Sequence, residues 1–411
     1  MYCKKCGVEL DHKIGFCTKC NRDNNNFRYN EVNFQKPRNP MLKVMIWIII
    51  LTIIITVSFI ISINRYKNSN KDTYFTNEWA LVKTKDNKFI FINEYNEKLN
   101  DKVYDDAKPF NNKLAAVKVN KTWKYIDDKG VDAFEGCYEY ANSYNEELAV
   151  VVVDGKSGVI DKDGKIIIYP QYGYIGKFNE GLAVVQNNDK WGVINKENEL
   201  IVNFKYDEIK DFKEGYAVVQ NNHRYGVINK DGKEIVISNY EMIGSFNEGL
   251  AVVCKDSKYG YINKEGKIII ELKYDSAQSF SEGLAAVYRN NSWRYIDRNG
   301  LIVIYANYEI VGPFNEGMAP IVQYNTTSER NYSYKYGYIN KKGVVTIKPK
   351  YIYVGLYKDK LAPVLCEQGM GFIDKKGDWI IKPQYYDVNN IGMYMPIDMY
   401  HPYWERYIYN R

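Results

Sequence analysis

The chain has 411 residues, a formal net charge of +6 and an aromatic content of 15%, to which 39 tyrosines contribute most. Because basic and acidic residues are mixed along the chain, nothing indicates a surface that follows a phosphate backbone, and we expect no nucleic-acid partner. The sequence also holds no P-loop, nucleophile elbow or dinucleotide-binding fingerprint, and its three histidines do not cluster. We therefore expect a protein that is not an enzyme.

Residues 1–21 carry four of the seven cysteines, in two identical pairs. Cys3 and Cys6 form one Cys-x-x-Cys knuckle, and Cys17 and Cys20 form the second. Four thiolates in this arrangement suit one tetrahedral Zn²⁺ ion and leave no open coordination position, so the zinc would be structural. Two disulfides are the alternative, and they would require an oxidising compartment. The stretch MYCKKCGVEL…GFCTKCN resembles the short N-terminal zinc ribbons that precede a membrane anchor in many bacterial proteins.

A membrane anchor is predicted next. Residues 22–41 are rich in Asn and contain Pro37 and Pro40, which is typical of a flexible linker. Residues 42–63 are predicted to form a transmembrane helix, because the uncharged run Val44–Ile63 would be roughly 30 Å long as a helix, the thickness of a bilayer's hydrocarbon core. A buried helix of a soluble domain is the alternative. Residues 64–74 form a second polar linker.

The orientation of this anchor follows from charge and from the cysteines. Four basic residues precede the span and three follow it, namely Arg28, Lys36, Arg38 and Lys43 against Arg65, Lys67 and Lys71. This excess favours a cytoplasmic N-terminus. Zinc thiolates are also best kept in a reducing compartment. We therefore expect a single-pass protein of a bacterial cell membrane, with the zinc ribbon cytoplasmic and the remainder extracytoplasmic.

The remainder, residues 75–411, is a tandem repeat. The segment FNEGLAV returns in altered form every 34 residues, with seven regular openings at Phe110, Tyr144, Phe178, Phe212, Phe246, Phe280 and Phe314. Phe75 opens an earlier unit one residue out of step. Tyr357 opens the last unit after 43 residues, because Tyr324–Tyr332 is predicted to be a nine-residue loop insertion. A degenerate tenth unit (Met395–Asn410) would cap these nine units.

Short apolar runs separated by turns predict antiparallel strands within each unit. In one unit they are Leu182–Gln186, Trp191–Asn195 and Leu200–Phe204, with a shorter fourth strand at Tyr206–Lys210. The turn position of Asn198 is glycine in seven other units, which indicates a left-handed conformation.

Two aromatic ladders recur with the repeat. The first comprises Phe89, Trp123, Trp191, Tyr225, Tyr259, Trp293 and Tyr336, often followed by a glycine that would let another backbone approach closely. The second comprises Tyr104, Tyr138, Tyr172, Tyr206, Tyr240, Tyr274, Tyr308, Tyr351 and Tyr385. We predict that both form the core between repeats, with a ring-stacking ligand surface as the alternative.

Units of the form FNEGLAVV…KWGVINKEGKIII…YD are similar to those of the WG-repeat family of bacterial proteins, from Phe75 to Ile391. The Trp-Gly pair itself stands only at Trp191-Gly192. The resemblance implies an all-β repeat array that serves as an interaction scaffold, with no catalytic residues to carry over. The array could be a β-propeller-like ring or an open β-solenoid. Since 34 residues are few for a four-stranded blade and the two ends duplicate rather than complement each other, we favour the open form or an imperfect ring.

A third ladder is acidic and comprises Glu78, Glu146, Glu180, Glu214, Glu248, Glu282, Glu316 and Asp359. We predict that these residues cap backbone amides in the turns before the following glycines; a row of carboxylates facing a cationic partner is the alternative. Cys137, Cys254 and Cys366 fall at different phases of the repeat and are expected to be buried free thiols.

The expected function is that of a membrane-anchored, non-enzymatic scaffold that binds a protein partner. The alternative is a lectin-like module that binds cell-wall glycans through exposed tyrosines of the second ladder.

Overall fold

The computed structural model describes residues 16–17, 22–23, 75–326 and 332–386, in two compact units that divide between Lys71 and Asp72. In the first unit, β1 (Phe16–Cys17) pairs antiparallel with β2 (Arg22–Asp23). The predicted membrane span, the second linker, the cap, the first linker beyond Asp23 and three of the four cysteines predicted to bind zinc lie outside the described residues. Within the described ranges, no helix has the length and apolar character needed to cross a bilayer.

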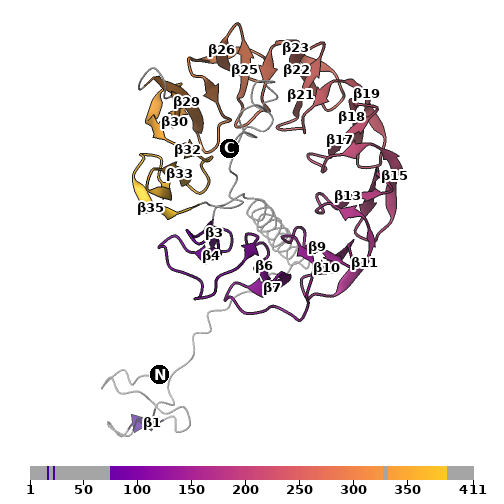
Figure 1. The fold of residues 1–411 in the computed structure, drawn as a ribbon, viewed down its shortest axis with the longest axis vertical. Coiled ribbons are helices and arrows are strands. Elements are labelled where there is room, and N and C mark those ends of the chain that lie inside the picture. Colours follow the sequence, from indigo (N-terminus) through magenta and orange to yellow (C-terminus); the bar gives the residue numbers. More distant parts are fainter. Residues whose placement is uncertain (1–15, 18–21, 24–74, 327–331, 387–411) are drawn as a thin grey trace. The chain divides into compact units, whose positions relative to one another are not determined.

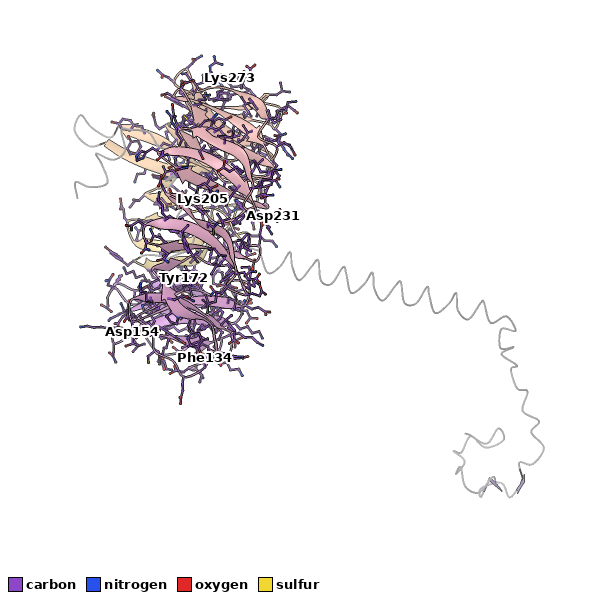
Figure 2. The ribbon with its side chains drawn as sticks, turned by 90° about the vertical axis from the view of Figure 1, so that its right-hand side faces the viewer. Phe134, Asp154, Tyr172, Lys205, Asp231 and Lys273 are labelled. Carbon is purple, nitrogen blue, oxygen red and sulfur yellow. The ribbon has the colours of Figure 1, made fainter. Side chains whose placement is uncertain are left out.

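The described part of the second unit consists of nine successive antiparallel sheets, of which seven have four strands, one has three and one has two. Figure 1 shows that they follow one another around a ring, with the last strand of each four-stranded sheet at the outer rim. The prediction of an all-β array of nine units is confirmed. The strands are short because each one only crosses the thickness of the ring (Figure 2).

The strands fall into four classes by their position in the sheet. The short innermost strands are β5 (Asp106–Ala107), β8 (Tyr140–Ala141), β12 (Tyr174–Ile175), β16 (Glu208–Ile209), β20 (Met242–Ile243), β24 (Ser276–Ala277), β28 (Ile310–Val311) and β32 (Tyr353–Val354). The second strands are β3 (Ala80–Lys83), β6 (Leu114–Val119), β9 (Leu148–Val153), β13 (Leu182–Asn187), β17 (Tyr216–Asn221), β21 (Leu250–Lys255), β25 (Ala285–Arg289), β29 (Met318–Thr326) and β33 (Ala362–Cys366). The third strands are β4 (Phe89–Ile92), β7 (Thr122–Asp127), β10 (Lys156–Asp161), β14 (Lys190–Asn195), β18 (Arg224–Asn229), β22 (Lys258–Asn263), β26 (Ser292–Ile296), β30 (Tyr332–Asn340) and β34 (Gly369–Ile373). The outer strands are β11 (Ile166–Tyr172), β15 (Leu200–Tyr206), β19 (Glu234–Tyr240), β23 (Ile268–Tyr274), β27 (Ile302–Ala306), β31 (Val345–Tyr351) and β35 (Trp379–Tyr385).

The short strand of each unit joins the sheet of the following unit. Ile209 of β16 pairs with Val219 of β17, not with β15, so the strand predicted at Tyr206–Lys210 is present but belongs to the next sheet. Successive four-stranded sheets are therefore joined by a continuous chain segment that forms strands in both.

The glycine after the first aromatic allows a bulge in the outer strand. In β14 the register with β15 shifts on both sides of Val193, and a Cβ added at Gly192 would lie 2.6 Å from the carbonyl oxygen of Val202. The predicted close approach of a backbone is confirmed. Proline occupies the bulge in three units, at Pro170, Pro349 and Pro383, where an interrupted ladder tolerates a residue without an N–H.

The hydrophobic core is divided into nine clusters, one between each pair of neighbouring sheets around the ring. Between the fourth and fifth sheets, for example, Val193 and Val202 meet Ala217 and Ile228. A single sheet could not cover its own apolar face, which is the reason the units form an array.

The ring closes between its first and last sheets. Ala80 and Ile90 share a cluster with Ile381, the rings of Phe75 and Phe372 lie 5.7 Å apart, and the Tyr386 amide donates to the Lys83 carbonyl at 3.0 Å. The preference for an open solenoid was therefore wrong. The Tyr386 amide bonds to β3 as the Ile352 amide bonds to Leu365 of β33, so the segment after the last outer strand reaches the first sheet.

The predicted insertion lengthens a hairpin. Tyr324 pairs with Tyr334 and Thr326 with Tyr332, so most of the extra residues extend β29 and β30 and are not a loop from Tyr324 onward.

Candidate functional site

The acidic ladder joins neighbouring units on one face of the ring. The Glu214 carboxylate accepts hydrogen bonds from the Gly249 amide at 2.9 Å and the Glu248 amide at 2.6 Å, in the turn of the next unit. The Lys264 ammonium completes the site at 3.1 Å. The predicted capping of backbone amides is confirmed, but the cap reaches 35 residues along the chain instead of acting within its own turn. The equivalent pairs are Glu146–Lys196, Glu180–Lys230, Glu282–Lys341 and Glu316–Lys375, at 3.0–3.1 Å.

The position of these glutamates is conformationally costly. Glu214 has φ +53° and Gly215 has φ +87°, the arrangement of a two-residue type I′ turn, in which Asn or Asp is the usual first residue. A left-handed Glu costs about 1 kcal/mol or more, which the contacts to the next unit offset. Burial raises the pKa of the Glu214 carboxyl, but the Gly249 amide and the Lys264 ammonium outweigh burial, and the pKa lies below its usual value.

Glu78 does not belong to this ladder. In the first unit Asn77 has φ +51° and Glu78 has φ +73°, so Glu78 takes the place that Gly215 has in its own turn. The lysine partners were missed, although the signal was available: a basic residue recurs with the repeat in the turn that begins with Lys196. Since the carboxylates are occupied by amides and lysines, we interpret this ladder as a structural feature.

Acidic residues also join units on the opposite face. Asp207 accepts a hydrogen bond from Lys190 Nζ at 2.7 Å and from the Asn222 amide of the next hairpin turn at 2.7 Å. The Lys190 ammonium and the Asn222 amide hold the pKa of the Asp207 carboxyl below its usual value. Both faces of the ring are thus crossed by contacts between neighbouring units.

The two aromatic ladders lie between the sheets. Trp123 and Trp293 of the first ladder are buried, as are Tyr206 and Tyr351 of the second. The remaining members of both ladders are at least half-buried. The Tyr206 hydroxyl donates to Glu234 Oε1 at 2.9 Å, in the next unit. The prediction of inter-repeat core is confirmed, and the second ladder does not offer open rings for stacking.

The outer rim carries exposed apolar side chains in all seven described outer strands. In each outer strand the edge away from the ring has no partner strand within the described residues. Figure 2 shows Lys205 of β15 and Tyr172 of β11 on this wall. Large exposed apolar residues on it are Ile166, Ile167, Tyr169, Leu200, Ile237, Ile268, Ile269, Ile302, Val303, Tyr305, Val345, Trp379 and Ile380. Unpaired edges and exposed apolar side chains are both features of surfaces that bind other chains.

The predicted zinc site is described only in part. Cys17 lies opposite Arg22 in the hairpin of β1 and β2, and Cys20 lies between these strands in sequence. Cys3, Cys6 and Cys20 are outside the described residues. Elsewhere in the described ranges, no group of three or more His, Cys, Asp or Glu side chains could hold a metal ion.

The three remaining cysteines are free thiols, as predicted, but they are not all buried. Burial raises the pKa of the Cys254 thiol to about 11, which makes it unreactive near neutral pH. Cys137 is exposed and Cys366 is half-buried, so the prediction of buried thiols holds only for Cys254.

A ring of antiparallel sheets, stapled from unit to unit on both faces, defines a repeat-built β scaffold of propeller type. The model of the WG containing repeat family matches residues 91–123, 158–191, 191–223, 225–259, 259–293, 293–326, 336–368 and 370–391. The chain belongs to this family. No curated protein matches it.

The chain matches many solved structures, among them the following two. A eukaryotic initiation factor superposes with a TM-score of 0.55 over 75% of this chain and 96% of that chain, at 10% identity. Kluyveromyces lactis Hsv2p has a TM-score of 0.37 over 57% of this chain and 92% of that chain, at 9% identity. The first likeness supports the ring fold alone.

Proposed function

We propose that the protein is a membrane-anchored, non-enzymatic scaffold whose ring binds a protein partner at its outer rim. The observation that carries this proposal is the rim itself, where outer strands combine an unpaired edge with exposed aliphatic residues such as Ile268 and Ile269. An extended segment of a partner could add to such an edge by main-chain hydrogen bonds, with the aliphatic side chains supplying apolar contact.

The remaining parts of the proposal rest on the sequence. The uncharged run Val44–Ile63 supports a single membrane span, and the four cysteines Cys3, Cys6, Cys17 and Cys20 support one structural Zn²⁺. The thiolate set fits zinc, and the β1–β2 hairpin spans the second knuckle, as a turn that presents two thiolates requires. With the ribbon cytoplasmic and the ring outside, the protein would connect an extracytoplasmic partner to the inner side of the membrane.

Photo-crosslinking in cells tests the binding surface. A benzoylphenylalanine placed at Ile269 on the rim is expected to give protein adducts, because its side chain is 42% exposed and points away from the core. The matched control is the same residue at Lys255, which is also exposed in the same four-stranded sheet but lies at the hairpin end of β21. Adducts at Lys255 that equal those at Ile269 would contradict the proposal.

Protease treatment of intact cells tests the orientation. Loss of the ring with protection of the ribbon is expected, and a protected ring would place the partner in the cytoplasm.

Glycan binding is the second candidate function. The second ladder no longer supports it, but Tyr169 and Tyr305 on the rim are 74% and 71% exposed and could stack on sugar rings. Binding of the protein to purified cell wall, lost when both tyrosines are replaced by alanine, would favour this function over a protein partner.

A further inference from the structure

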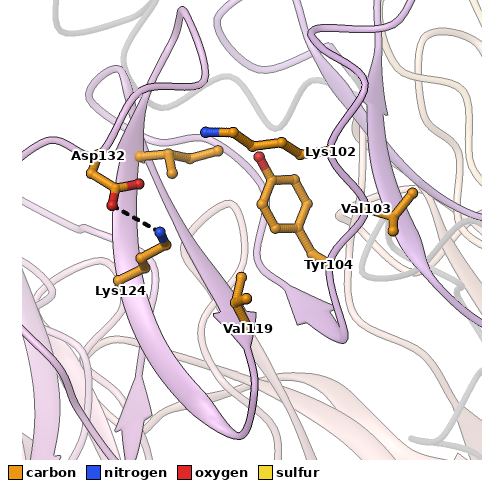
Figure 3. A pocket seen from close by; sticks show the side chains of 7 residues that line it. Lys102, Val103, Tyr104, Val119, Lys124 and Asp132 are labelled. Atoms are coloured by element: carbon orange, nitrogen blue, oxygen red, sulfur yellow. Dashed lines mark hydrogen bonds and ion pairs between the residues drawn. The ribbon is translucent and has the colours of Figure 1, made fainter.

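A cavity of about 320 Å³ lies between the outer parts of the first and second sheets (Figure 3). Its floor is apolar and consists of the Tyr104 ring, Val119 and Ile126. Lys102, Lys124 and Asp132 place charged groups around it. A small concave site with an apolar floor and a few convergent polar groups is the usual form of a small-molecule site.

The cavity exists because the repeat pattern fails here. The second sheet has no regular outer strand: residues from Asp132 to Tyr138 form no continuous ladder with β7, and their β-bridges to it are single ones at the two ends. Lys124 stands where most units have the bulge glycine. The family model leaves residues 124–157 unmatched, between its segments 91–123 and 158–191.

The junction of the fourth and fifth sheets, which also has an acidic residue at the position of Asp132, provides a comparison. Adding 102, three repeats, to the numbers of Lys102, Lys124 and Asp132 gives Phe204, Gly226 and Glu234. The junction of the first and second sheets therefore has two lysines where the compared junction has an aromatic residue and a glycine. These two positions carry no lysine in any other unit.

Asp132 and Glu234, the acidic residues of the two junctions, also have different partners. Glu234 Oε1 accepts a hydrogen bond from the Tyr206 hydroxyl at 2.9 Å, which closes the junction of the fourth and fifth sheets. Asp132 is one methylene shorter and pairs with Lys124 Nζ at 2.8 Å instead. Tyr104 is the counterpart of Tyr206, and its hydroxyl accepts a long hydrogen bond from Asn100 Nδ2 at 3.5 Å. It does not donate to Asp132 in the way that the Tyr206 hydroxyl donates to Glu234.

Three donors therefore converge on the cavity. Lys102 Nζ donates to the Gly130 carbonyl at 3.1 Å and Lys124 Nζ to Asp132, so each ammonium has further N–H groups to offer. The Tyr104 hydroxyl adds an O–H donor, and its side chain is almost completely buried. With two ammonium groups and one carboxylate, the lining carries one net positive charge.

We propose that this cavity binds a small carboxylate with an apolar body, whose carboxylate is held by Lys102 and Lys124 and whose body rests on the Tyr104 ring. The net positive charge selects an anion, and the apolar floor selects against a fully hydrated one such as a free inorganic ion. This site is separate from the rim strands with the exposed aliphatic residues, and it goes beyond the scaffold function.

Fluorine NMR of 4-fluorobenzoate with the full-length protein in detergent micelles tests the site, with neutral 4-fluorobenzamide as the comparison probe. We expect the benzoate to bind with a dissociation constant of about 1 mM or tighter and the benzamide to bind at least about tenfold more weakly. Lys102→Met and Lys124→Met should each weaken benzoate binding about tenfold or more.

Lys258→Met is the matched control, because Lys258 forms a surface ion pair with Asp275 at 2.6 Å in a regular sheet. It should leave benzoate binding unchanged. Since Lys102 is exposed, Lys102→Met should leave the fold intact. It therefore tests carboxylate binding even if Lys124→Met alters the local fold. The proposal is overturned if benzoate does not bind, if benzamide binds as well as benzoate, or if Lys102→Met and Lys258→Met have the same effect.

Discussion

Replacing Gly192 by alanine would test whether the glycine of the Trp-Gly pair is needed for the approach of the outer strand. The new Cβ would lie 2.6 Å from Val202 O, whereas van der Waals contact begins at about 3.4 Å, so β15 must move outward by several tenths of an ångström. Overpacking of this kind costs about 1–3 kcal/mol. The φ of Gly192 is not in the left-handed region, so the cost is steric.

Gly181→Ala provides the matched control in the same unit. A Cβ at Gly181 would meet no atom within 4 Å, but its φ is +86°, so alanine there costs about 1–2 kcal/mol of backbone strain without displacing a neighbour. Both variants should therefore lower the melting temperature. Hydrogen exchange of the full-length protein separates them, because only Gly192→Ala should speed exchange of the amides in Leu200–Tyr206.

Displacement of β15 by the new Cβ is refuted if β15 keeps its protection from exchange in Gly192→Ala, or if the two variants speed its exchange equally. One unit of the chain already has a side chain at this position. Arg294 occupies the glycine position in the seventh sheet, and there β26 and β27 pair with a single register shift, between Tyr295 and Ile296, where β14 and β15 have two. A side chain at this position thus goes with a straighter outer strand.

Three further predictions concern the contacts of the acidic ladder, the closure of the ring and the predicted zinc site. Glu214→Gln should lower the free energy of unfolding by about 1 kcal/mol at pH 7. Because the folded-state pKa of Glu214 is lowered, its contribution is present above about pH 4.5 and is lost as the pH falls through the folded-state pKa. Urea titrations of variant and parent should therefore converge at low pH, and a constant difference would contradict the pairing. Phe372→Ala, in a fully buried position, should cost about 3–5 kcal/mol and speed exchange in both β4 and β34, whereas an effect on β34 alone would argue against closure. Cys20→Ser should abolish the binding of about one zinc per chain, measured by elemental analysis, and leave the melting of the ring unchanged; retention of zinc would rule out the four-cysteine site.

Local structure was predictable because its causes are local. The runs predicted at Leu182–Gln186 and Trp191–Asn195 became β13 and β14 with ends displaced by one residue, since turn residues mark where strands must stop. The left-handed turn position was found in the same way: Asn198 has φ +64°, as its alternation with glycine indicates.

Partners across the ring were not predictable from one unit. The sequence identified Glu214 as a turn residue that caps amides, but the amides it caps belong to residues 248 and 249. Nothing in a turn specifies which neighbouring turn its side chain reaches, since this depends on the rotation between successive sheets. The same limit concealed the cavity, because Lys124 departs from the pattern in sequence but only the missing outer strand makes it line a space.

Ring closure depends on the phase of the repeat as well as on its length. Each four-stranded sheet takes its innermost strand from the preceding unit, so neighbouring sheets are joined by the chain as well as by their cores. The described sheet β3–β4 has no such strand, and it meets the last sheet through side-chain packing, the Tyr386–Lys83 main-chain hydrogen bond and the contact of Tyr385 with Asn96. Among the nine interfaces of the described ring, this closure therefore lacks the covalent link that the others share. It should be the first to open, and loss of the Phe372 ring should act there before it acts on any other interface.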